Sequence, residues 1–146
     1  MEAKSLEIRI SRYFQAPRES VFAQWLEAES LKDWFTPQTY VGISAKADAR
    51  VGGAWQVEYQ SPDGQRISEQ GIYEVIDPPD RLVLTLTQTI DPDLPETRIF
   101  VALEEADEGG TLMHFRQAGF ESETLRKEVA QGWLGCFEKL EMRLTR

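Results

Sequence analysis

Residues 52–76, GGAWQVEYQSPDGQRISEQGIYEVI, contain two strand-like segments separated by a turn. In the first segment Trp55, Val57 and Tyr59 alternate with polar residues, which is typical of a strand that buries one face. The sequence PDG at positions 62–64 favours a tight turn, and the residues after it return as a second strand. The stretch therefore predicts an antiparallel β-hairpin with one apolar face.

Further strands are predicted on both sides of this hairpin. Before it, residues 40–47 form one strand, and residues 5–14 form another in which Leu6, Ile8 and Ile10 share a face. After it, strands are predicted at 81–89, 97–105 and 110–120. Tight turns between successive strands predict an antiparallel sheet in meander order.

Two short helices are predicted between the first strand and the rest of the sheet. Pro17 stands where a helix can begin, and four apolar residues follow it at helical spacing: Val21, Phe22, Trp25 and Leu26. Residues 29–35 form the second helix, with Ser30 as its N-cap and Pro37 after its end.

After Phe120 the pattern becomes helical and stays so to the end of the sequence. Such a sheet needs cover on one face, and this helix is the only predicted element long enough to provide it. Trp133, Cys136 and Leu140 define its apolar face at 100° per residue. We therefore expect an α+β fold in which residues 1–146 form one domain.

Two glycines, Gly132 and Gly135, lie inside this helix, and each costs roughly 1 kcal/mol relative to alanine. Gly132 lies at an edge of the apolar face, which predicts either a close approach to the sheet or room for a ligand beside Trp133. Gly135 projects toward the polar side, as do Leu134 and Met142. These three indicate a second contact, either with the early helices or with another chain.

Composition limits the possible functions. The 25 acidic and 16 basic residues give a formal net charge of −9, which disfavours nucleic acid and anionic membrane surfaces. One cysteine cannot form an internal disulfide. The first residues lack the apolar region of a signal peptide, and no apolar run is long enough to span a bilayer. These features favour a soluble cytoplasmic protein.

Catalytic and metal-binding patterns are weak. His114 alternates with Met113 and Phe115, so we expect it on the outer face, and Cys136 is expected to be a buried, protonated thiol. Asp91, Asp93 and Glu96 lack the EF-hand spacing and glycine, which favours a solvated loop. The pairs at 52–53 and 109–110 are expected to be turn or bulge glycines. We predict no catalytic residues, metal or cofactor, and enzymatic activity is the less favoured possibility.

Several segments, in order, resemble the SRPBCC (START-like) superfamily, and more narrowly the group named after the C-terminal domain of the activator of the Hsp90 ATPase. These segments are APRESVFAQW at 16–25, DARVGGAWQVEY at 48–59, GIYEVIDPPDRLVLT at 71–85, EGGTLMHFRQAGF at 108–120 and GWLGCFEKLE at 132–141. The resemblance implies a helix-grip fold, with a curved antiparallel sheet around the C-terminal helix and often a cavity between them. It also implies binding or transformation of apolar ligands such as lipids, sterols, polyketides and flavonoids.

The inward-facing aromatic residues suit either a filled core or the lining of a ligand cavity, since both require the same residue types. Tyr59 and Gln117 favour a cavity, because polar atoms on an apolar face need partners. The predicted ligand-binding residues are Trp34, Trp55, Val57, Tyr59, Leu84, Leu86, Met113, Phe115, Gln117, Phe120, Trp133 and Phe137.

The sequence therefore favours a small-molecule-binding protein with an apolar ligand, lipid-like or polyketide-like, between sheet and helix. One alternative is an interaction module for an Hsp90-type chaperone. Another is an enzyme of the cyclase or aromatase type that uses pocket shape and a Tyr or Gln proton relay. A monomer or a homodimer is expected.

Overall fold

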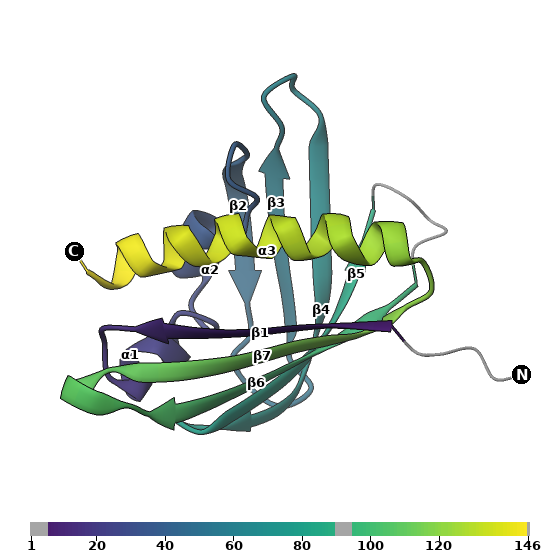
Figure 1. Cartoon of the computed structure of the whole chain (residues 1–146). Coiled ribbons are helices and arrows are strands. Elements are labelled where there is room, and N and C mark those ends of the chain that lie inside the picture. Colours follow the sequence, from purple (N-terminus) through teal and green to yellow (C-terminus); the bar gives the residue numbers. More distant parts are fainter. Residues whose placement is uncertain (1–5, 90–94, 146) are drawn as a thin grey trace, which may run out of the picture.

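The computed structural model describes residues 6–89 and 95–145. Its main element is a seven-stranded antiparallel sheet with the order β1-β7-β6-β5-β4-β3-β2 (Figure 1). The strands are β1 (Leu6–Phe14), β2 (Val41–Ala47), β3 (Ala54–Gln60), β4 (Arg66–Asp77), β5 (Arg81–Gln88), β6 (Thr97–Glu105) and β7 (Thr111–Phe120). The predicted meander is confirmed, and β1 pairs with β7 at one edge.

The helices are α1 (Arg18–Ala23), α2 (Ala28–Trp34) and α3 (Glu123–Leu144), with a short 3₁₀ turn η1 (Asp107–Gly109) before β7. The sheet curves around α3, so that β1 and β7 run nearly along the helix in Figure 1 and β2 to β4 cross behind it. Ser122 caps α3 by accepting a hydrogen bond from the backbone N–H of Leu125 at 3.2 Å. The helix-grip architecture and the long covering helix are thus as predicted.

The alternation that predicted the hairpin is seen directly. Trp55, Val57 and Tyr59 of β3 are buried, and β3 pairs with β4 in an unbroken register from Ala54 opposite Ile72 to Gln60 opposite Arg66. Because successive side chains of a strand point to opposite faces, this register places the apolar face of both strands under α3.

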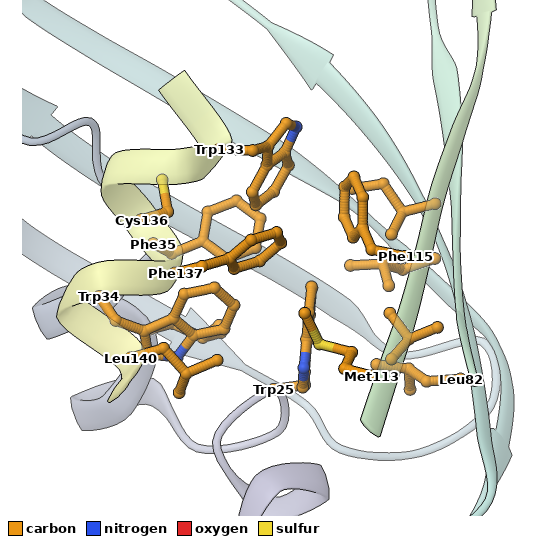
Figure 2. Close-up of a cluster of buried hydrophobic side chains, with 14 of the residues drawn as sticks. Trp25, Trp34, Phe35, Leu82, Met113, Phe115, Trp133, Cys136, Phe137 and Leu140 are labelled. Atoms are coloured by element: carbon orange, nitrogen blue, oxygen red, sulfur yellow. The ribbon is translucent and has the colours of Figure 1, made fainter. Parts of the chain in front are cut away.

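The C-terminal half of α3 covers a densely packed aromatic core (Figure 2). Phe137 and Leu140 of α3 are fully buried, as are Trp25 and Trp34 from the α1–α2 region. The ring centroids of Trp25 and Trp34 lie 4.8 Å apart in an edge-on arrangement, which is a favourable geometry for aromatic pairs. We refer to this region, together with Phe115 of β7, as the filled half of the space between sheet and helix.

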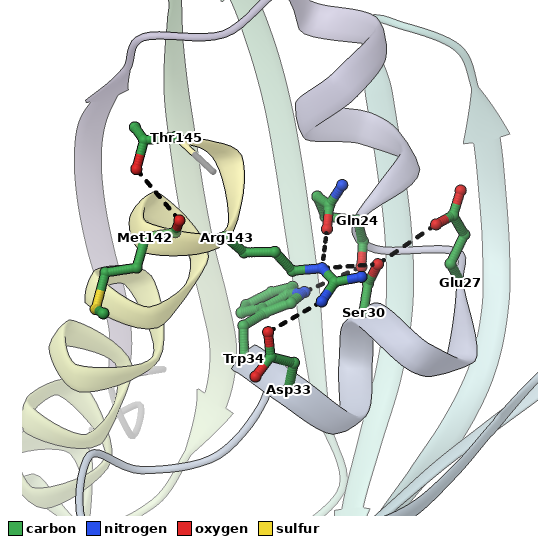
Figure 3. A network of polar contacts seen from close by, with 8 residues as sticks. All are labelled: Gln24, Glu27, Ser30, Asp33, Trp34, Met142, Arg143 and Thr145. Atoms are coloured by element: carbon green, nitrogen blue, oxygen red, sulfur yellow. Dashed lines mark hydrogen bonds and ion pairs between the residues drawn. The ribbon is translucent and has the colours of Figure 1, made fainter.

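A polar network joins the last turn of α3 to α1 and α2 (Figure 3). The Nε of Arg143 donates to the side chain of Gln24 at 2.8 Å and to the hydroxyl of Ser30 at 3.2 Å. The predicted role of Ser30 as an N-cap is wrong. The helix begins earlier, at Ala28 after the N-cap residue Glu27, so Ser30 lies inside α2, where its fully buried hydroxyl needs these partners.

The two glycines of α3 have different surroundings. A Cβ at Gly135 would lie 2.9 Å from both the backbone nitrogen and the Cβ of Gln38, so this glycine permits close contact with the segment that follows α2. Lys139 holds that segment by donating to the carbonyl oxygens of Pro37 at 2.8 Å and Tyr40 at 3.0 Å. A Cβ at Gly132 would meet nothing within 4 Å, so the expected close approach to the sheet is wrong for Gly132 and the alternative, room beside Trp133, is what the structure contains.

Both glycine pairs occupy turns, as expected. Gly52 and Gly109 have positive φ angles of 85° and 76°, a conformation that glycine adopts without steric cost. Within residues 6–89 and 95–145, no helix has both the length and the apolar character that crossing a membrane requires.

Candidate functional site

A pocket with a volume of about 550 Å³ lies between the N-terminal half of α3 and the sheet. The sheet contributes Tyr59, Glu69, Leu86, Gln88, Thr97, Gln117 and Phe120. The helix contributes Leu125, Glu128, Val129, Gly132, Trp133 and Cys136, and Phe35, Pro37 and Pro95 complete the lining. The pocket therefore lies on the same face of the sheet as the filled half, farther toward the start of α3.

The residues predicted to bind a ligand divide into two groups. Those that line the pocket are Tyr59, Leu86, Gln117, Phe120 and Trp133. Those that lie in the packed core and outside the pocket lining are Trp34, Trp55, Val57, Leu84, Met113, Phe115 and Phe137. Ligand contact stays a prediction for both groups, but the structure brings only the first group together around free space.

Trp133 marks the boundary between the pocket and the filled half. Its ring centroid lies 4.7 Å from that of Phe115 and 5.1 Å from that of Phe35, and its side chain also lines the pocket. Its Nε1 donates a hydrogen bond of 2.7 Å to the side-chain oxygen of Gln117. This indole is therefore fixed by packing on one side and by a hydrogen bond on the other.

Gln117 has the polar partners that its inward position requires. Besides accepting from Trp133, it donates from Nε2 to the hydroxyl of Thr97 at 2.8 Å, and both groups are buried. A ligand is thus not needed to satisfy the amide, which is held in one orientation by the protein itself. The network stiffens the pocket wall where β6, β7 and α3 meet.

Glu69 of β4 is the buried charged residue among the pocket residues that the sequence analysis did not predict to bind a ligand. Its side chain lines the pocket although the residue is only 8% exposed. The strand alternation contained the signal, because Glu69 falls on the same face as Ile67 and Tyr73, where a carboxylate is unexpected. A charged residue at an inward strand position is a reason to suspect a functional site.

Burial raises the pKa of Glu69 from 4.5 to about 7, because the charged form loses its solvation in the pocket. Hydrogen bonds from Tyr59 and Gln88 act in the opposite direction by stabilising the carboxylate. The Nε2 of Gln88 lies 3.5 Å from the carboxylate oxygen. Glu69 can therefore exchange a proton near neutral pH, inside an otherwise mainly apolar pocket.

The other titratable groups around Glu69 keep their protons. Burial raises the pKa of the Tyr59 phenol far above its usual value, and the neighbouring Glu69 carboxylate raises it further. Burial likewise raises the pKa of the Cys136 thiol, again with a contribution from Glu69. Cys136 is thus a buried, protonated thiol, in agreement with the sequence analysis.

The remaining candidates for chemistry lie elsewhere or outside the described residues. His114 is on the outer face, where its ring contacts the hydroxyl of Ser11 at 3.1 Å and the carboxylate of Glu104 at 3.0 Å. Asp91 and Asp93 lie outside the described residues. Within the described ranges, no group of three or more His, Cys, Asp or Glu side chains is placed to hold a metal ion.

The chain matches, over residues 15–145, the model of the family described as "Activator of Hsp90 ATPase homolog 1-like protein". Among solved structures, a protein from Chromobacterium violaceum is similar at 27% identity with a TM-score of 0.87, covering 96% of this chain and 97% of that chain. A protein from Arthrobacter aurescens has 24% identity and a TM-score of 0.83, covering 99% of this chain and 89% of that chain. The AHSA1 protein from Silicibacter pomeroyi has 21% identity and a TM-score of 0.83, covering 96% of this chain and 98% of that chain. No curated protein matches the chain significantly.

Proposed function

The chain belongs to the activator of Hsp90 ATPase homolog 1-like family, and we propose that it binds a small, mainly apolar molecule in the pocket between the sheet and α3. The observation that carries this proposal is the pocket of about 550 Å³ beside a fully packed core. Small-molecule sites have volumes of roughly 300–1,000 Å³ and apolar walls with a few placed polar groups. The pocket has both properties.

The wall residues suggest a division of roles. Phe120, Leu125 and Val129 supply apolar contact area, while Trp133 supplies a rigid aromatic face. Tyr59 and Glu69 place polar atoms at the opposite side of the pocket, on β3 and β4. A ligand with an apolar body and one polar group would match this arrangement.

The test is a thermal-unfolding panel of lipids and aromatic polyketide-like compounds. A compound that binds only the folded chain raises the unfolding midpoint. We expect at least one compound to do so, and we expect Gly132→Leu to remove the effect by filling the open space beside Trp133. Gln131→Leu is the matched control, because it adds the same side chain to the same helix at an exposed position.

Two results would argue against the proposal. One is the absence of any midpoint shift across the panel for the unaltered chain. The other is a shift that Gly132→Leu leaves unchanged, since binding would then take place away from the pocket.

A second candidate function is an interaction with an Hsp90-type chaperone, which the description of the matching family favours. Its test is the ATPase rate of the chaperone with and without the chain. A rate change that persists in Gly132→Leu would support this function independently of the pocket. The cyclase or aromatase activity, the cytoplasmic location and the choice between monomer and homodimer stay predictions.

A further inference from the structure

The charged side chains that line the pocket in the described part of the chain all have one sign. Among the described residues that line it, the charged side chains are Glu69 and Glu128, and none is basic. Glu69 is buried at the inner wall and Glu128 is exposed on α3. Inside a pocket of low polarity such charges act strongly on a ligand, so a bound anion would be repelled and a bound cation attracted.

Within residues 6–89 and 95–145, Glu69 has no basic partner. The groups that face it are the Tyr59 hydroxyl and the Gln88 amide, with the protonated thiol of Cys136 on α3. Lys139 of α3 is engaged with the carbonyl oxygens of Pro37 and Tyr40 instead. A buried carboxylate without a positive partner is energetically costly, and a ligand that brings a positive charge would remove this cost.

The carboxylate also has room for a further hydrogen bond. Two carboxylate oxygens offer about four acceptor positions, and Tyr59 and Gln88 occupy two of them. The ammonium group of an amine carries only donors. It therefore complements Glu69, whereas an ionised carboxylate, which only accepts hydrogen bonds and is negatively charged, would not.

We propose that the pocket selects an apolar amine, with its protonated nitrogen on the Glu69 carboxylate and its hydrocarbon part against Phe120, Leu125 and Val129. This inference rests on the proposed function and names the ligand class for the same pocket. The apolar contacts are shared by any amphiphile of suitable size. Glu69 is what distinguishes the amine from the alcohol and the acid.

Three ligands of equal chain length test the proposal: decylamine, decanol and decanoic acid, each titrated calorimetrically into the full chain at pH 8. We expect decylamine to bind about tenfold tighter than decanol, because both head groups can donate a hydrogen bond to the carboxylate but only the ammonium group also brings a positive charge to it. Decanoic acid should bind most weakly. Glu69→Gln should remove most of the preference for decylamine over decanol, because the amide carries no charge to pair with the ammonium group.

Glu105→Gln is the matched control, because it removes the same charge from an exposed position. Glu105 ends β6, whereas the pocket residue Thr97 begins that strand. It should leave the preference for decylamine intact. A pH series on the unaltered chain gives an independent readout. Since the pKa of Glu69 is raised to about 7, decylamine binding should tighten up to roughly tenfold from pH 6 to pH 8, while decanol binding should not change.

The outcomes distinguish a failure of the amine inference from a failure of the proposed ligand-binding function. Binding of decanol or decanoic acid at least as tightly as decylamine overturns the amine inference and leaves the pocket function standing. A decylamine preference that survives in Glu69→Gln also overturns it, since the overall negative charge would then be the cause. If none of the three ligands binds, the inference fails, and the compound panel decides separately whether the pocket binds other molecules.

Discussion

The two halves of the space between α3 and the sheet use similar residues but are filled to different degrees. In the filled half, Phe137 and Leu140 are fully buried against Trp25 and Trp34 (Figure 2). In the other half, the side chains of α3 face the pocket of about 550 Å³. The difference follows from the α1–α2 region. In Figure 1, α2 lies beside the C-terminal half of α3, and Trp25 and Trp34 pack into the core there.

Because of this difference, we expect the filled half to stabilise the fold and the pocket to bind the ligand. The filled half fixes α3 by packing, and the Arg143 network ties its last turn to α2 through Asp33 at 3.0 Å (Figure 3). The helix is thereby held at one end, so the other end can leave space over the sheet without losing its position. We therefore expect substitutions in the filled half to lower the free energy of unfolding strongly. Substitutions at the pocket should change it less and should alter ligand binding.

The largest expected effect is the loss of Phe137. Phe137→Ala should lower the free energy of unfolding by about 3–5 kcal/mol, because Phe137 is fully buried and its loss leaves a cavity in the core. Phe120→Ala is the matched change at the pocket and should cost roughly 2 kcal/mol or less, because Phe120 already faces free space. Urea unfolding measures both. Equal losses would contradict the division into a filled half and a pocket.

The second effect, of roughly 3 kcal/mol for a pKa raised from 4.5 to about 7, concerns Glu69 and depends on pH. Its pKa is about 7 in the folded chain against an ordinary value of 4.5, so between these values the folded state binds more protons than the unfolded state. The free energy of unfolding contributed by Glu69 therefore falls as pH rises through this window, and the loss is complete above pH 7. Glu69→Gln cannot titrate and should be more stable than the unaltered chain at pH 8 but not at pH 4.

Urea unfolding of both proteins across this pH range measures the difference. Glu105→Gln, which removes an exposed charge from β6, should show no such pH-dependent gain. A stability difference for Glu69→Gln that is the same at pH 4 and pH 8 would show that burial does not perturb this carboxyl.

The third effect is at Gly135, in the filled half. Gly135→Ala gains helix propensity worth about 1 kcal/mol but places a Cβ 2.9 Å from the backbone nitrogen of Gln38. Overpacking of this kind costs about 1–3 kcal/mol, and Lys139 prevents the Gln38 segment from moving away. We expect a net destabilisation of about 1 kcal/mol, measured by urea unfolding. A stabilised variant would show that the segment can shift.

The sequence predicted the sheet well because its strands carry a simple signal. Alternation in β3, with Trp55, Val57 and Tyr59 buried, settles which face is covered, and tight turns settle which strands pair. The Ser30 cap was wrong because a serine before a helix and a serine one turn inside it look alike in sequence. Only the tertiary contact with Arg143 shows that Ser30 is buried.

The pocket was harder to predict, because a filled core and a cavity wall need the same apolar residues. Phe115 and Phe120 lie on the same strand, β7, yet only Phe120 lines the pocket. What separates them is that Phe115 packs against the rings of Trp25 and Phe137, and these contacts are distant in sequence. Glu69 could have been found from its inward register, but its altered pKa could not, since that depends on burial under α3.

The smallest expected effect is at Gly132, and it has the opposite sign. A Cβ at this position meets nothing within 4 Å, so Gly132→Ala should gain the propensity of alanine without a clash and raise the free energy of unfolding by about 0.5–1 kcal/mol. Urea unfolding beside Gly135→Ala compares two glycines three positions apart in one helix. Opposite signs would show that α3 is packed at one glycine and free at the other, whereas a loss of stability in both variants would mean that the space beside Trp133 is not open. A stabilised Gly132→Ala would also show that this glycine is retained at a cost to folding, as expected for a position that keeps room for a ligand.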